Sequence, residues 1–188
     1  SIIVDFLDAA GLNAAVFVGH SMGSAIALTL ALDFPKRVLG LGLVGSGARL
    51  RVAPLILDTT SSAATFPTAV KLINDAEFGP SVNPRMKELA AQRMAEIRPS
   101  VLHGDFLACN EFDVLARLEE ISAPTLILCG ADDILTPVKY SEFLRDQITG
   151  ARLVTFPGAG HMVMLEQPTE VANALAEFAD SIPYRAGQ

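Results

Sequence analysis

Three residues of this chain have types and positions suited to nucleophilic catalysis: Ser21, Asp133 and His161. Ser21 lies in Gly-His-Ser-Met-Gly, residues 19–23, a very short joint between two apolar runs. A serine hydroxyl is a weak nucleophile until a base takes its proton, and a histidine held by an acid is the usual base. Such a set would carry out acyl transfer at a carbonyl carbon.

The joint around Ser21 has the pattern of a nucleophile elbow, in which Gly-x-Ser-x-Gly connects a strand to a helix. Because this turn is tight and strained, we expect small residues at Gly19 and Gly23 and an exposed serine at the C-terminal edge of a sheet. The N-terminus of the following helix favours negative charge at the same place. The N–H of Met22 is therefore the predicted oxyanion donor. An ordinary tight turn is the alternative interpretation of so short a motif.

Among the three histidines of the chain, His161 is the predicted base. It lies in a glycine-rich loop after the last predicted strand, and the C-terminal edge of a parallel sheet would place that loop near Ser21. A solvated loop histidine is the alternative. His20 lies inside the elbow and should point away from the serine, so we expect it to pack or to brace a loop. His103 falls in a helical segment and is expected to be a surface or core histidine.

Two adjacent carboxylates, Asp132 and Asp133, follow the predicted strand at 124–130. A loop side chain at this position can reach the Nδ1–H of a histidine, and adjacent residues on an extended loop point in opposite directions. Only one of the two should therefore face His161. The alternative, that a carboxylate solvates the turn or caps the next helix, applies more to Asp132. The chain order Ser21, Asp133, His161 is one of the known orders of a catalytic triad.

The elements that must position these residues alternate along the chain between strands and helices. Apolar runs predict strands at 14–19, 37–46, 124–130 and 151–158. Helices are predicted at 2–10, at 22–34 and from Pro168 onward. A further helix is predicted after Thr136, with Thr136 as its cap and Pro137 in its first position. This alternation predicts the α/β class, with a parallel sheet built of βαβ units and flanked by helices.

The middle of the chain interrupts this alternation, because no convincing strand occurs between the second and third strand signals. Helices are predicted within 61–78 and 83–97, the latter with Asn83 as cap. We interpret residues 49–123 as a helical cap inserted between two core segments, 1–48 with the elbow and 124–188 with the acid and base loops. Its larger apolar side chains would line a substrate pocket or form the core of the cap: Phe66, Ile73, Phe78, Met86, Met94, Phe106 and Leu107.

Composition excludes several classes of protein. The chain is 51% hydrophobic with a mean hydropathy of +0.39, but no apolar run reaches the roughly 18 to 20 residues that span a bilayer. A net charge of −7 without a basic cluster argues against nucleic acid or an anionic membrane as partner. Cys109 and Cys129 form neither a disulfide framework nor a metal-ligand pattern. With no pattern of a signal peptide at the start, we expect a cytoplasmic protein.

Three segments together resemble α/β-hydrolases that carry a helical cap, a group of esterases, lactonases, C–C hydrolases and cofactor-free haloperoxidases. They are VGHSMG at 18–23, PTLILCGADDILTP at 124–137 and GAGHMVMLEQPTEVANAL at 158–175. The resemblance implies Ser21 as nucleophile, Asp133 as acid and His161 as base, and the spacing from Gly130 to Pro137 selects Asp133 over Asp132. Ser24 stands where members often have a third glycine. The resemblance implies no metal and no organic cofactor.

This resemblance also implies an activity. We expect a serine hydrolase that cleaves small to medium apolar carboxylic esters through an acyl-enzyme. The alternatives are a C–C hydrolase, a lactonase or a cofactor-free haloperoxidase on the same triad, and an inactive fragment or ligand-binding module of hydrolase fold.

Members of this group carry further strands and a loop with a second oxyanion donor ahead of the helix at 2–10. The chain therefore corresponds to the C-terminal half of such a sheet, with Met22 as its one evident donor. We expect the strand at 14–18 to pair with a second copy of the chain or with an N-terminal segment, because its backbone would otherwise be an open edge.

Overall fold

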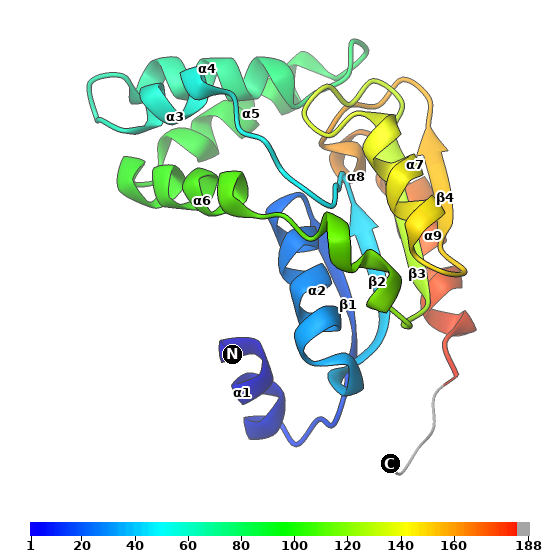
Figure 1. Cartoon of the computed structure of the whole chain (residues 1–188). Coiled ribbons are helices and arrows are strands. Elements are labelled where there is room, and N and C mark those ends of the chain that lie inside the picture. Colours follow the sequence, from blue (N-terminus) through cyan, green and yellow to red (C-terminus); the bar gives the residue numbers. More distant parts are fainter. Residues whose placement is uncertain (184–188) are drawn as a thin grey trace.

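A four-stranded parallel sheet runs through the part of the chain that the computed structural model describes, residues 1–183 (Figure 1). The strands are β1 (Ala15–His20), β2 (Val38–Val44), β3 (Thr125–Gly130) and β4 (Arg152–Phe156). They lie side by side in the order β1-β2-β3-β4, and each neighbouring pair is parallel. The predicted α/β class and the four predicted strands are confirmed.

Helices cover both faces of this sheet, as the two hydrophobic cores show. One face packs against α1 (Ile2–Ala9), α2 (Met22–Asp33), α7 (Val138–Gln147) and the 3-10 helix η2 (Leu115–Glu120); the other packs against α8 (Val163–Glu166) and α9 (Pro168–Ser181). A further 3-10 helix, η1 (Pro35–Arg37), leads from α2 into β2. Side chains alternate between the faces with the period of two that strands impose. Leu41, Leu43 and Ile127 are in the first core, and Val44, Leu126 and Leu128 are in the second.

Four helices lie across the C-terminal ends of the strands, between β2 and β3 in the sequence (Figure 1). They are α3 (Pro54–Thr60), α4 (Phe66–Ala76), α5 (Pro84–Ala95) and α6 (Pro99–Glu111), and each carries a proline at its first or second position. Helices α4 and α5 confirm the two predicted helices, and Asn83 caps α5 by accepting a hydrogen bond from the N–H of Arg85. Sequence analysis did not place α3 and α6 individually.

The end of the predicted cap segment belongs physically to the sheet. Leu118 and Ile121 are almost fully buried in the core that β2 and β3 form with α2. The chain therefore leaves the helices over the strand ends, runs along one face of the sheet, and enters β3 at the N-terminal end of that strand.

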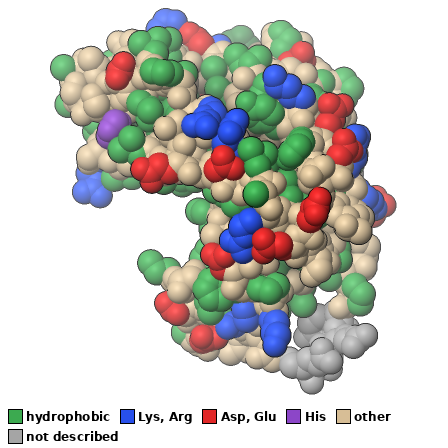
Figure 2. Space-filling model, viewed as in Figure 1, with side chains coloured by type: hydrophobic (Ala, Val, Ile, Leu, Met, Phe, Trp, Pro, Cys, Tyr) green, Lys and Arg blue, Asp and Glu red, His purple; other side chains and the backbone are tan. Residues whose placement is uncertain are grey.

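None of the helices within residues 1–183 is long and apolar enough to cross a membrane. On the face shown in Figure 2, acidic and basic side chains are interspersed.

Strand β1 lies at the edge of this sheet and pairs only with β2 among the described strands. The N–H of Ser21 donates to the carbonyl of Val44, so the alternation along the strand turns the N–H groups of Val16 and Val18 away from β2. The Val18 side chain is 54% exposed. None of the six residues is charged or a proline, the usual means by which an open edge is protected.

We expect the 188-residue chain, expressed alone, to associate with a second copy through β1. Val18→Lys should shift it toward monomer, because a lysine on an edge strand opposes further pairing. Size-exclusion chromatography with light scattering measures the state, and hydrogen exchange measures protection of the Val16 and Val18 amides. Leu39→Lys is the matched control, since Leu39 is exposed on the internal strand β2. A soluble wild-type monomer whose Val16 and Val18 amides exchange rapidly would contradict the expectation.

Candidate active site

The turn at Ser21 has an unusual backbone conformation. Ser21 has φ +52° and ψ −114°, and it is the one non-glycine residue within 1–183 with a positive φ. Such a conformation costs on the order of 1–3 kcal/mol and persists only where the surroundings hold it. Here the Ser21 N–H donates to the carbonyl of Val44 (2.9 Å), and the Ser21 carbonyl accepts from Ser24 (2.9 Å) and Ala25 (3.2 Å). The turn is thus anchored to β2 and to α2.

The glycines on either side of this turn have different roles. A Cβ on Gly19 would collide with the backbone of Gly23, so the close passage of strand and helix requires glycine there. A Cβ on Gly23 would meet no described atom within 4 Å apart from its chain neighbours and the nearby backbone of α2, so the expectation that crowding requires a small residue is wrong at Gly23. Ser24 has a role that sequence analysis missed. Its buried hydroxyl donates to the Gly19 carbonyl (2.6 Å) and accepts from the N–H of Val44 (3.2 Å), which joins β1, α2 and β2 at the elbow.

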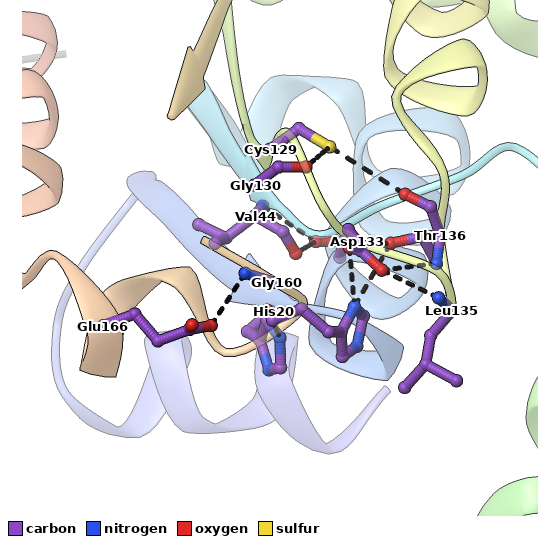
Figure 3. Close-up of polar contacts among 11 residues, drawn as sticks. His20, Val44, Cys129, Gly130, Asp133, Leu135, Thr136, Gly160 and Glu166 are labelled. Atoms are coloured by element: carbon purple, nitrogen blue, oxygen red, sulfur yellow. Dashed lines mark hydrogen bonds and ion pairs between the residues drawn. The ribbon is translucent and has the colours of Figure 1, made fainter. Parts of the chain in front are cut away.

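Asp133 and His161, predicted from loops 28 residues apart, meet in a buried hydrogen bond. The Nδ1–H of His161 donates to Oδ2 of Asp133 at 2.8 Å, and both residues are 4% exposed. The other carboxylate oxygen accepts the backbone N–H groups of Leu135 (2.9 Å) and Thr136 (2.8 Å) (Figure 3). With Nδ1 protonated, Nε2 is the free base of the ring. Asp132 is exposed, so the expectation that only one aspartate faces His161 is confirmed.

The acid is held in its charged form by these donors. Burial alone would raise the pKa of Asp133, but the hydrogen bond and charge of His161 and the donors of Thr136 outweigh burial and lower it. Thr136 was expected to cap the next helix, and that expectation is wrong. Helix α7 begins at Val138 with Pro137 as its cap residue, and the Thr136 hydroxyl instead donates to Oδ2 of Asp133 (2.7 Å). The Thr136 hydroxyl is thus used by the buried carboxylate and not by the first turn of α7.

His20 braces the loop that carries the base. Its Nε2–H donates to the backbone carbonyl of His161 (3.0 Å), and the two rings lie 4.6 Å apart, which confirms the expected bracing role. Both rings pack over Gly45, which has φ +53° and where a Cβ would lie 3.1 Å from the His161 ring. Burial and the neighbouring His161 lower the pKa of His20 to about 4, so it is neutral at pH 7. His103 bonds Thr60 (3.0 Å) and links α6 to α3, as expected of a structural histidine.

Glu166 fixes the base loop to the helices above it. One carboxylate oxygen accepts the N–H of Gly160 (2.8 Å), next to His161 (Figure 3). The other accepts the N–H of Gly79 (2.9 Å), just after α4. The N–H of Met162 adds a bond to the carbonyl of Glu77 (2.9 Å). Sequence analysis missed this role. The signal in the sequence was that Glu166 follows closely after the glycine-rich loop of His161. The backbone amides of such a loop need hydrogen-bond acceptors, and a nearby carboxylate can supply them.

A pocket of about 390 Å³ opens between the sheet edge and helices α3, α4 and α6, and Ser21 and His161 both line it. The remaining lining residues are mostly apolar: Leu50, Arg51, Val52, Ala53, Leu55, Ile56, Leu72, Ile73, Ala76, Phe106, Cys109, Ile134, Leu135 and Thr136. Of the apolar residues predicted to form a pocket or a cap core, Ile73 and Phe106 line this pocket, Phe66 and Phe78 are buried, Met86 and Met94 line a separate cavity, and Leu107 is 42% exposed. Burial raises the pKa of Cys109, so that thiol stays protonated.

Met22 occupies the position expected of an oxyanion donor. It is the first residue of α2, directly after Ser21, and the first N–H groups of a helix have no acceptor within the helix. The structure thus brings Ser21, His161, Asp133 and Met22 to one edge of a parallel sheet. Helices α3 to α6 lie over this edge and form a helical cover. A strained serine, a base held by a buried carboxylate and an adjacent helix N-terminus define a site suited to acyl transfer.

The chain belongs to the alpha/beta hydrolase fold family, whose model matches residues 1–168. A solved structure described as a thermophilic esterase is 40% identical to it with a TM-score of 0.81, over 90% of this chain and 67% of that one. "Putative carbamate hydrolase RutD" of Klebsiella pneumoniae is 31% identical, over 82% of this chain and 62% of the relative. The 2-hydroxy-6-oxo-6-phenylhexa-2,4-dienoate hydrolase of Burkholderia cepacia is 31% identical, over 85% of this chain and 60% of the relative. The chain thus spans about three fifths of the length of these two curated relatives.

Two buried groups beside His161 should give opposite dependences of stability on pH. Burial, opposed by His161 and Lys87, raises the pKa of Glu77 to about 7, so between pH 7 and 4.5 the folded chain binds a proton that the unfolded chain lacks. Stability from Glu77 therefore rises on acidification. His20, with its pKa lowered to about 4, has the reverse effect between pH 6.5 and 4. The lowered pKa of Asp133 changes the pH dependence of stability only below the ordinary value of 3.8, which is outside this range.

We expect these two contributions to offset each other in the wild-type chain and to separate in single variants. From pH 7 to pH 5, Glu77→Gln should lose roughly 1–2 kcal/mol of unfolding free energy relative to wild type, and His20→Asn should gain a similar amount. Urea unfolding followed by circular dichroism at the two pH values measures both. Parallel curves for wild type and both variants would show that neither group titrates in this range.

Proposed function

We propose that this chain hydrolyses carboxylic esters through a triad of Ser21, His161 and Asp133. The observation that carries the proposal is the 2.8 Å hydrogen bond between His161 Nδ1 and Asp133 Oδ2, made beside the pocket that Ser21 and His161 line together. It leaves Nε2 as a base directed by a buried carboxylate. The 40% identity to a solved esterase supports an ester as substrate.

The reaction proceeds in two steps. His161 Nε2 takes the proton of the Ser21 hydroxyl as its oxygen attacks the ester carbonyl, and the resulting oxyanion accepts the Met22 N–H. His161 then protonates the leaving alcohol, which gives the acyl-enzyme. In the second step His161 takes a proton from water, which attacks the acyl carbonyl; His161 then returns that proton to Ser21 Oγ as the acid leaves. Asp133 remains ionised throughout and stabilises the imidazolium that forms in each step.

The apolar lining supports a small to medium acyl or alcohol group. Ile73 and Phe106 would contact it from the helical cover, and Leu135 from the acid loop. Carbon–carbon bond hydrolysis is the second candidate on the same residues, and the name of the Burkholderia relative favours it. Comparison of a p-nitrophenyl ester panel with a vinylogous 1,5-diketone acid separates the two reactions by product.

A fluorophosphonate probe should label Ser21, because an activated serine displaces its leaving group to form a stable phosphonyl ester. Ser21→Ala should abolish both the labelling and the ester turnover, as measured by intact mass and p-nitrophenol release. Ser61→Ala, at an exposed serine in the helical cover, is the control and should retain both. Ester turnover that survives in Ser21→Ala at the wild-type rate would overturn the proposed mechanism.

The two adjacent aspartates should differ greatly in their effect on rate. Asp133→Asn would hold His161 in the wrong tautomer, because an amide presents an N–H where the ring also has one, and should lower kcat by about 10³ to 10⁴. Asp132→Asn should change kcat less than threefold, since that side chain is exposed. Steady-state kinetics on p-nitrophenyl butyrate, with thermal unfolding as a folding control, tests the pair. The reverse pattern would assign the acid to Asp132.

A further inference from the structure

Arg51 is an isolated cation at the pocket that holds Ser21 and His161. It is the one arginine or lysine among the lining residues, and no aspartate or glutamate lines the pocket. Within residues 1–183, no ion pair or hydrogen bond involves the Arg51 side chain. Its near neighbour Arg49, in contrast, pairs with Asp113 (3.6 Å). A chain with a net charge of −7 thus leaves one positive charge unpaired beside its proposed nucleophile.

Hydrogen bonds on both sides of Arg51 hold its backbone at the rim of the pocket. The N–H of Leu50 donates to the carbonyl of Phe112 (3.4 Å), and the N–H of Val52 donates to the side-chain oxygen of Asn110 (3.2 Å). These bonds hold the segment before α3 against the end of α6. Leu50 is buried, while Arg51 is exposed at the pocket. Arg51 lines the pocket together with the apolar residues on either side of it, Leu50 and Val52.

A guanidinium in this place has a defined chemical preference. Its planar set of N–H donors matches a carboxylate, which it binds through two parallel hydrogen bonds. The bond strengthens where neighbouring apolar groups exclude water, as Leu55, Ile56 and Phe106 would do around a bound molecule. A wholly apolar substrate would leave the cation with solvent alone. A substrate with an apolar chain and a terminal carboxylate would use the apolar walls and the cation together.

We propose that Arg51 binds a free carboxylate of the substrate, and that the preferred substrates are monoesters of apolar dicarboxylic acids. This inference rests on the proposed ester hydrolysis at Ser21. The ester carbonyl would lie at Ser21 and Met22, the methylene chain along Ile73 and Phe106, and the distal carboxylate at Arg51. Arg51 is then a specificity-determining residue that takes no part in the proton transfers.

Two p-nitrophenyl esters of pimelic acid test the inference, one with the distal carboxyl free and one with it methylated. The wild-type kcat/KM should be about tenfold higher for the free acid, mainly through a lower KM, because the charge pair acts on binding. Arg51→Gln should remove this preference, because it should lower kcat/KM for the free acid about tenfold more than kcat/KM for the methyl ester. Arg49→Gln, which removes the paired arginine outside the pocket, should keep the preference. Raising the salt concentration should reduce the preference in wild type and in Arg49→Gln, the two forms that keep Arg51.

A binding measurement separates failure of the inference from failure of the proposed function. Monomethyl pimelate should bind Ser21→Ala more tightly than the Ser21→Ala, Arg51→Gln double variant by about tenfold, as measured by calorimetry. Turnover of the methyl ester without any preference for the free acid, or equal binding by the two variants, overturns the role of Arg51. Arg51-dependent binding without turnover of either ester supports the carboxylate site and overturns ester hydrolysis.

Discussion

The backbone of Ser21 has to be held in a conformation that a serine does not adopt on its own, and the surrounding fold supplies the restraint. Its N–H is bonded to Val44 at the end of β2, and its carbonyl is bonded to the first turn of α2. Ser24 adds a side-chain bond on each side of the elbow. Without β2 or α2 the turn could relax to an ordinary conformation. The pairing of β1 with β2 therefore keeps Ser21 in its strained conformation at the edge of the pocket.

The same sheet edge brings the other groups to that serine. Parallel strands end at one edge, so the loops after β2, β3 and β4 converge there without any sequence proximity. The loop after β3 carries Asp133, and the loop after β4 carries His161. Gly45, after β2, leaves the space that both histidine rings fill. Each loop is held by backbone amides, which makes the geometry of the site a consequence of the sheet.

The strands and the elbow could be predicted from the sequence because the patterns that indicate them are local. The four apolar strands and the elbow follow from residues close together in the chain, and the resemblance to α/β-hydrolases, through the short spacing from Gly130 to Pro137, selected Asp133. The roles of Thr136 and Glu166 did not follow, because each depends on a partner brought near by folding. Glu166 meets Gly79 across 87 positions of sequence. Thr136 has good capping chemistry, and only the nearby buried carboxylate decides against that use.

Glu166 also couples two parts of the molecule mechanically. A swing of α4 away from the sheet would break its bond to Gly79 and the bond between Met162 and Glu77, both of which lie on the C-terminal side of the base His161. Each break costs about 1 kcal/mol, and more where the acceptor is charged. Helices α3 and α6 share no hydrogen bond with that loop among the described residues. A movement of α3 and α6 would therefore break none of the hydrogen bonds that join Glu166 and Met162 to the segment after α4.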